Sequence, residues 1–262
     1  MKQCLNCQAE LHGPYCHHCG QKGSTHRYSI KSLLTHDLLH SVWHVDKSIL
    51  RSWWQVLKAP GKEGHKNIAG KRAGQFPILT LAIFATILIL LALEFQAPED
   101  HMIVKFGKFD FTEWVHHNAK WLWLSMILFL ALSDSVYFRR LRYNLAEHIV
   151  LTTYYYVGFV TVLTLALVLF RLTPNNWEWM DWITPAVCLF YIIYAYRQGF
   201  KAGYSIVGWL WRFLFSWLSF IGILLVAISI LTLSLNANYG KAHLQIQYGT
   251  EAADSAAPAP AH

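Results

Sequence analysis

Four cysteine residues near the N-terminus form the pattern with the clearest chemistry. They are arranged as two Cys-x2-Cys pairs, Cys4 with Cys7 and Cys16 with Cys19, and eight residues separate the pairs. This spacing can place four thiolates tetrahedrally around one Zn²⁺ ion, at Zn–S distances of about 2.3 Å. Because four protein ligands leave no open position for water, the sequence predicts one structural zinc ion per chain, held in a zinc ribbon.

Two other interpretations of the cysteines stay open at this point, namely a pair of disulfides and a redox or iron site. Disulfides are rare in a reducing cytoplasm, where the charge pattern discussed below places this segment. His12, His17 and His18 lie close to the cysteines in the sequence and could replace a ligand. The simpler expectation is that these histidines are exposed residues of the ribbon.

A second group of residues suits a metal site of a different kind. Asp37, His40 and His44 are spaced i, i+3 and i+7, which places them near one face of a helix. Glu147 and His148, at the start of a later apolar run, could add ligands from across a helical bundle. Such a site would be catalytic and would carry a possible second metal. The alternative is that the histidines face water or lipid headgroups.

Three charged residues lie close to or inside apolar runs. Asp134 falls within such a run, where it either pairs with a nearby arginine or belongs to a proton or ion pathway. Lys71 and Arg72 precede the first apolar run, a position that favours contact with anionic lipid headgroups. Nucleophile motifs such as G-x-S-x-G and H-E-x-x-H are absent from the sequence, so enzyme status rests on the Asp37 group alone.

The elements that must position these residues are predicted to be membrane helices. The 262 residues are 55% hydrophobic and only 14% charged, with a mean hydropathy of +0.28, which excludes an ordinary soluble domain. We expect an all-α membrane protein with about five transmembrane helices. The expected spans are residues 77–95, 121–138, 148–170, 179–197 and 208–233. The fourth span is the weakest, because its continuous apolar part is short.

The distribution of lysine and arginine predicts the orientation. With five spans, seventeen of the 22 basic residues fall on the side of the N-terminus and five on the other side. The positive-inside rule then places the N-terminus in the cytoplasm and the C-terminus in the periplasm or extracellular space. The same asymmetry explains the net charge of +7, so no nucleic-acid partner is expected.

Four regions follow from these patterns. Residues 1–24 form the zinc ribbon and residues 25–76 an amphipathic juxtamembrane helical segment, whose helical part Pro60 and Gly61 end. This segment lies either in the membrane plane or against the bundle. Residues 77–235 form the transmembrane bundle. Residues 236–262 are rich in alanine and proline and are expected to be a flexible tail.

Several short stretches of the chain match a known sequence pattern and follow one another in the same order. The matching stretches are Cys4-x2-Cys7, Tyr15-Cys16-x2-Cys19-Gly20-Gln21-Lys22, Thr25-His26-Arg27, His40-x3-His44-x-Asp46-Lys47, Pro60-Gly61, Gly70-Lys71-Arg72, Pro77 and Asn144-x2-Glu147-His148. In these stretches the chain resembles a family of bacterial inner-membrane proteins of unknown function with an N-terminal zinc ribbon. The resemblance is close over about the first 95 residues. It implies a multispanning protein with a cytoplasmic ribbon and implies no reaction.

These features lead to one expected function and two alternatives. We expect the ribbon and the juxtamembrane segment to form a docking or assembly platform for a partner protein or lipid. The first alternative is a membrane-embedded, metal-dependent enzyme acting on a lipid or isoprenoid. The second is a small transporter component, with Asp134 and Glu147 as coupling groups.

Overall fold

Long helices make up most of the computed structural model, which describes residues 2–33, 48–95, 101–172, 180–200, 203–240 and 242–247. The five longest are α4 (Ile78–Phe95), α5 (Phe111–Tyr137), α6 (Leu145–Leu172), α7 (Met180–Phe200) and α8 (Ile206–Tyr239). Among the described residues, four helices, α4, α5, α6 and α8, are long and apolar enough to cross a membrane. This finding supports a membrane protein. The predicted count of about five spans is not confirmed, because α7, which contains Asp181, Arg197 and Gln198, does not reach the same apolarity.

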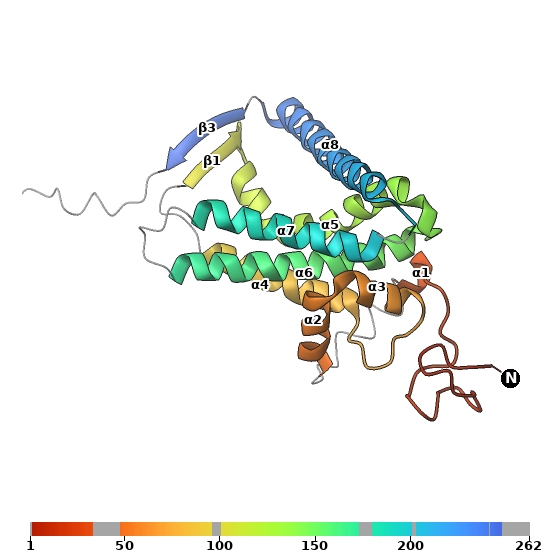
Figure 1. Ribbon diagram of the computed structural model, residues 1–262. Helices are drawn as coiled ribbons and strands as arrows, with labels where there is room; N and C mark the ends of the chain where they lie inside the picture. Colours follow the sequence, from red (N-terminus) through yellow and green to blue (C-terminus); the bar gives the residue numbers. More distant parts are fainter. Residues whose placement is uncertain are drawn as a thin grey trace, which may run out of the picture.

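Helix α6 lies at the centre of the bundle (Figure 1). It packs against α4, α5 and α7 and against two shorter helices, α2 (Ser48–Lys58) and α3 (Pro60–Ile68), whereas α8 packs mainly on α5. The first half of α6 is buried almost completely, although it contains several polar side chains. The buried polar residues of α6 are Glu147, His148, Thr152, Thr153, Tyr154, Tyr155 and Tyr156. The centre of the bundle is therefore polar at one end of α6 and apolar toward the other.

Side chains at the helix starts explain where three of the long helices begin. The carboxylate of Asp110 accepts the backbone N–H of Glu113 and caps α5, and the hydroxyl of Ser205 caps α8 in the same way. At the start of α6, Asn144 accepts the backbone N–H of Glu147 at 2.9 Å. Such caps satisfy N–H groups that the first turn of a helix leaves without partners.

The juxtamembrane segment contains α1 (Ile30–Ser32), α2 and α3. Helix α2 is amphipathic and packs on α6, where the indole N–H of Trp53 donates to Thr161 at 2.8 Å. The described part of this segment therefore contacts the bundle, and its placement relative to the membrane plane stays a prediction. The prediction that Pro60 and Gly61 end the amphipathic helix agrees with the end of α2 at Lys58. Pro60 ends α2 but also opens α3, since proline fits the first turn of a helix, where its missing N–H costs nothing.

Of the expected flexible tail from residue 236 onward, residues 236–240 and 242–247 are described, and residues 241 and 248–262 lie outside the described residues. Helix α8 continues to Tyr239, and residues 242–247 form strand β3 (Ala242–Gln247). This strand pairs antiparallel with β1 (His101–Phe106), which also pairs with β2 (Phe109–Asp110), so the sheet has the order β2-β1-β3. Residues 242–247 alternate apolar and polar side chains, a strand pattern that the alanine and proline content of the following residues obscures.

The N-terminal residues 2–28, here called the cysteine module, lie at one end of the bundle (Figure 1). We call this end the cysteine end. It is formed by the loop between α3 and α4, the turn between α5 and α6, and the C-terminus of α7. These segments are joined by His65, whose ring contacts Tyr143 and the backbone oxygen of Gly199. The cysteine end is the surface on which the candidate site is built.

Candidate metal centre

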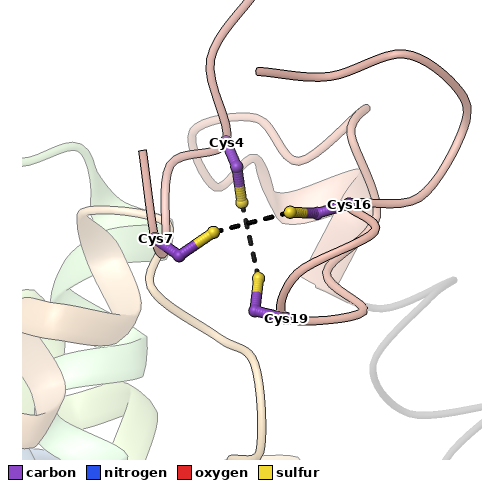
Figure 2. A group of neighbouring side chains, drawn as sticks. All are labelled: Cys4, Cys7, Cys16 and Cys19. Atoms are coloured by element: carbon purple, nitrogen blue, oxygen red, sulfur yellow. Dashed lines mark hydrogen bonds between the residues drawn. The ribbon is translucent and has the colours of Figure 1, made fainter. Parts of the chain in front are cut away.

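Four cysteine side chains converge in the cysteine module (Figure 2). Their sulfur atoms all lie within 4.8 Å of one another. The Sγ atoms of Cys4 and Cys19 are 3.6 Å apart, and those of Cys7 and Cys16 are 3.5 Å apart. Four thiolates around a zinc ion, with Zn–S bonds of about 2.3 Å, form a tetrahedron with S···S edges of about 3.8 Å. The four cysteines can therefore hold one metal ion.

The disulfide interpretation is not realised in this arrangement. All four cysteines are free thiols, and the sulfur atoms are much farther apart than the S–S bond length of about 2.05 Å. A closed set of four thiolates suits a structural metal, because no coordination position is left for a substrate or water.

The two cysteine pairs sit in two loops of equivalent backbone geometry. In the first loop the N–H of Cys4 donates to the carbonyl of Ala9, and in the second the N–H of Cys16 donates to the carbonyl of Gln21. The residue after each second cysteine is left-handed, with φ of 64° at Gln8 and 73° at Gly20. This turn directs backbone N–H groups toward the sulfurs, as a bound thiolate requires.

The backbone of these loops favours ionised thiols at the first cysteine of each pair. The N–H groups of Cys19 and His18 outweigh burial and lower the pKa of Cys16 to about 6. The pKa of Cys4 is lowered in the same way, first by the N–H of Cys7.

The pKa of Cys7 moves in the opposite direction. The backbone N–H of Ala9 lowers it, but burial and the three neighbouring thiols raise it to about 12. Four thiolates at these distances repel one another. Without a cation they cannot all ionise together.

The neighbouring histidines do not belong to the cysteine group. His12, His17 and His18 are all exposed, and His12 lies beside Glu10, 3.9 Å from its carboxylate. The metal-compatible set found among the described residues consists of the four cysteines alone.

The cysteine module is fixed to the bundle by the buried side chain of Gln21. Its amide N–H donates to the carbonyl of Gly70 at 2.8 Å, and its amide oxygen accepts the N–H groups of Arg72 and Ala73 at 2.9 and 3.1 Å. Leu5 packs directly on Gly70, which has a φ of +84°. A Cβ at that position would lie 2.7 Å from the Leu5 side chain. Glycine is therefore required there both for the backbone conformation and for the close approach.

An ion pair makes a second attachment. The guanidinium of Arg27 donates two hydrogen bonds to the carboxylate of Glu147, at 2.5 and 2.8 Å, and one to the carbonyl of Arg142. Glu147 is almost completely buried, whereas the Arg27 side chain is 62% exposed. The ionised carboxylate raises the pKa of Arg27 through these hydrogen bonds and its charge. Glu147 also accepts the N–H of Asn144, so its oxygens are well occupied.

A third attachment involves Tyr28 and Arg72. The Tyr28 hydroxyl donates to the side-chain oxygen of Asn67 at 2.5 Å, and the Arg72 guanidinium lies 3.7 Å from the centre of the Tyr28 ring. Arg72 also donates to the carbonyls of Asn67 and His26. Of the two residues predicted to bind lipid headgroups, Arg72 thus holds the module to the bundle, while Lys71 is exposed. Headgroup binding stays a prediction.

The module and the cysteine end enclose a cleft of about 330 Å³. Its walls combine apolar and charged side chains from three parts of the chain. They are Leu5, His26 and Arg27 of the module, residues 68–70 at the end of α3, and Tyr143 and Glu147 at the start of α6. The cleft exists because the module lies on the bundle.

The predicted catalytic group is only partly within the described residues. Asp37, His40 and His44 lie outside them. Glu147 is paired with Arg27, and His148 is buried, with its ring 6.0 Å from that of Tyr143 and its Nδ1 without a hydrogen-bond partner. Among the residues that the structure describes, no second metal-compatible group is present besides the cysteines.

Asp134 is placed differently from the predicted arginine pair. Its carboxylate is fully buried and accepts hydrogen bonds from the hydroxyls of Ser216 at 2.6 Å and Tyr196 at 3.0 Å. These partners come from α8 and α7, so the carboxylate joins three helices.

Sequence reasoning did not assign roles to Gln21 and Arg27, the two side chains that attach the module. Both lie within the stretches of the family resemblance, which was the only available signal. Comparisons of the chain with protein families, with curated proteins and with solved structures found no match. The family resemblance and the bacterial membrane that it implies therefore remain predictions.

Proposed function

We propose that this protein is a membrane-anchored docking platform, whose cysteine module presents a binding surface for a partner protein at the membrane face. In this proposal one zinc ion closes the module as a zinc ribbon. The module lies in the cytoplasm of a bacterial cell, as the family resemblance and the basic residues on the N-terminal side favour. The metal has a structural role, because four thiolates complete its coordination.

The attachment of the module to the bundle is the observation that supports this proposal most strongly. Gln21 and Arg27 connect the cysteine loops to the loop after α3 and to the start of α6. A partner bound to the module would therefore be held in a fixed position relative to the membrane. A flexible tether would leave its orientation free.

The outer surface of the module has features of a protein-binding surface. Tyr15 is 61% exposed in the second cysteine loop, and His17 and His18 are exposed beside it. Tyrosine is enriched among the residues that contribute most to protein interfaces, because a rigid ring supplies a large contact area with one polar atom. Lys22, also exposed, would add affinity for an acidic partner.

The first experiment measures the metal. We expect elemental analysis of the detergent-purified protein to give one zinc per chain, and a Cys4→Ser/Cys7→Ser variant to have none. Zinc that remains in this variant would reveal a second site. That result would favour the alternative of a metal-dependent enzyme that uses Asp37, His40 and His44.

The second experiment tests the platform itself. Proteins that copurify with the chain from its native membranes would be quantified for the wild type, for Tyr15→Ser and for Glu10→Gln, a control on the exposed first loop. We expect at least one protein to be lost with Tyr15→Ser and retained with the control, at unchanged zinc content. If no copurifying protein depends on Tyr15, the platform proposal is wrong.

A further inference from the structure

A row of buried polar atoms without partners runs along one face of α6. His148, Thr152 and Tyr155 are spaced i, i+4 and i+7, so they lie on the same face. Their exposed fractions are 1%, 1% and 4%, yet His148 Nδ1, Thr152 Oγ1 and the Tyr155 hydroxyl have no hydrogen-bond partner in the part of the chain described. An unpaired buried polar group costs about 1–3 kcal/mol, so three in a row call for an explanation.

The inner end of this row reaches the buried carboxylate of Asp134. A cavity of about 40 Å³ lies between α5, α6, α7 and α8, and Thr152, Tyr155 and Tyr196 contribute to its wall. Tyr196, a residue of this wall, donates to the carboxylate of Asp134. A cavity of this size is large enough for one water molecule, and its wall is mostly apolar.

The outer end of the row reaches the cleft at the cysteine end. The ring of His148 lies 6.0 Å from that of Tyr143, whose hydroxyl contacts His65 at 2.6 Å. Tyr143 also lines the cleft beneath the cysteine module. The row therefore begins beside a residue of the surface cleft and ends at the wall of the interior cavity.

The groups around Asp134 leave its charge uncompensated. Tyr196 from α7 and Ser216 from α8 donate to the carboxylate, and Tyr155 is the titratable group nearby on α6. No lysine, arginine or histidine forms an ion pair with Asp134 in the described chain. A carboxylate inside an apolar bundle needs a proton or a cation.

We infer that the row formed by His148, Thr152 and Tyr155 is a water-lined path that carries protons between the cleft at the cysteine end and the carboxylate of Asp134. A proton from water in the cleft enters the path, and the carboxylate takes it up to form a carboxylic acid. Release follows the same path in reverse. The path ends at Asp134, so the site stores a proton at the centre of the bundle.

The test follows the exchange of this proton for deuterium by infrared spectroscopy of the intact protein in lipid nanodiscs. The C=O band of the acid is identified by its absence from Asp134→Asn, and its shift in D2O is timed between about pH 5 and about pH 9. We expect Thr152→Val and Tyr155→Phe each to slow the exchange by about tenfold or more.

The neighbouring residues supply matched controls. Thr153→Val and Tyr156→Phe remove the same groups from buried hydroxyls that already have partners, the carbonyl of Ile149 and the hydroxyl of Thr86. We expect these controls to exchange at the wild-type rate. The inference is overturned if no band depends on Asp134 at any pH, or if all four variants exchange alike. A variant that fails to fold is recognised by thermal unfolding, and the other variant of its pair then decides.

Discussion

At the scale of single residues, side chains that carry both a hydrogen-bond donor and an acceptor join separate segments of the described structure. Gln21 uses its amide N–H and its amide oxygen on one backbone loop, and His65 uses its two ring nitrogens to join the turn before α6 to the C-terminus of α7. In the neutral ring the carbonyl of Gly199 accepts from Nε2, so the Nδ1 atom of His65 accepts the hydroxyl of Tyr143. This assignment fixes the neutral tautomer of the ring.

The first prediction concerns the pH dependence of stability through His65. Burial lowers the pKa of His65 below its ordinary value of 6.5, and the carbonyl of Gly199 offsets this only in part. The unfolded chain therefore takes up a proton at a higher pH than the folded protein does. Stability from this group is complete above about pH 6.5 and is lost as the pH falls below it. Thermal unfolding of His65→Gln should depend less on pH over this range than that of the wild type. An equal dependence would contradict the neutral ring.

A second prediction concerns the pair of Arg27 and Glu147. Arg27→Met leaves a buried carboxylate with the single N–H of Asn144, so the melting temperature should fall. Adding Glu147→Gln removes the charge that needs compensation, and the double variant should be more stable than Arg27→Met alone. If the decreases in melting temperature caused by Arg27→Met and by Glu147→Gln simply add in the double variant, the two residues do not act as a pair.

At the scale of elements, the packing of α3 against α7 depends on small residues. A Cβ at Gly61 would lie 2.4 Å from the backbone nitrogen of Gly199, and a Cβ at Gly199 would lie 1.5 Å from the Tyr155 hydroxyl. Neither backbone can move without shifting a helix. The absence of side chains at these positions thus allows α3 to sit close enough for His65 to reach the carbonyl of Gly199.

The third prediction compares two glycine substitutions in helices. Gly61→Ala should destabilise the protein by about 1–3 kcal/mol, because the new methyl group overlaps the backbone of α7. Gly222→Ala in α8, where no atom lies within 4 Å of the added Cβ, should be neutral or raise stability by up to about 1 kcal/mol. Urea unfolding of both variants in the same detergent gives the comparison. Equal effects would show that α3 does not pack as described.

At the scale of the whole molecule, the long helices alternate in direction, and basic side chains are concentrated in the turn between α5 and α6 at the cysteine end. The turn between α5 and α6 contains Arg139, Arg140 and Arg142, whereas Lys105 and Lys108 lie in the hairpin at the opposite end. The positive-inside rule then predicts that the cysteine module and this turn face the same compartment.

The fourth prediction tests this arrangement. A membrane-impermeant maleimide should label Arg139→Cys from the cytoplasmic side and Lys108→Cys from the other side. Labelling of both positions from one side would contradict a bundle that crosses the membrane. The native cysteines supply the background, which is measured on the wild type.

The sequence alone predicted the metal-compatible cysteines and four of the apolar helices, since both depend on local patterns of spacing and composition, whereas the predicted count of about five spans is not confirmed. Neither Gln21 nor Arg27 could be given a role, because their partners lie about fifty and 120 positions away in the chain. Strand β3 was missed for a similar reason. Its alternating pattern is only six residues long, and its partner β1 lies before α5.

The chemistry of the Gln21 attachment sets how the protein responds to ionic strength. The hydrogen bonds between the uncharged amide of Gln21 and the backbone have the same strength at low and at high salt concentration. The ion pair of Arg27 ends on a buried carboxylate, where mobile ions screen poorly. Concentrated salt releases many peripheral proteins from membranes. It should nevertheless leave the cysteine module bound to the bundle.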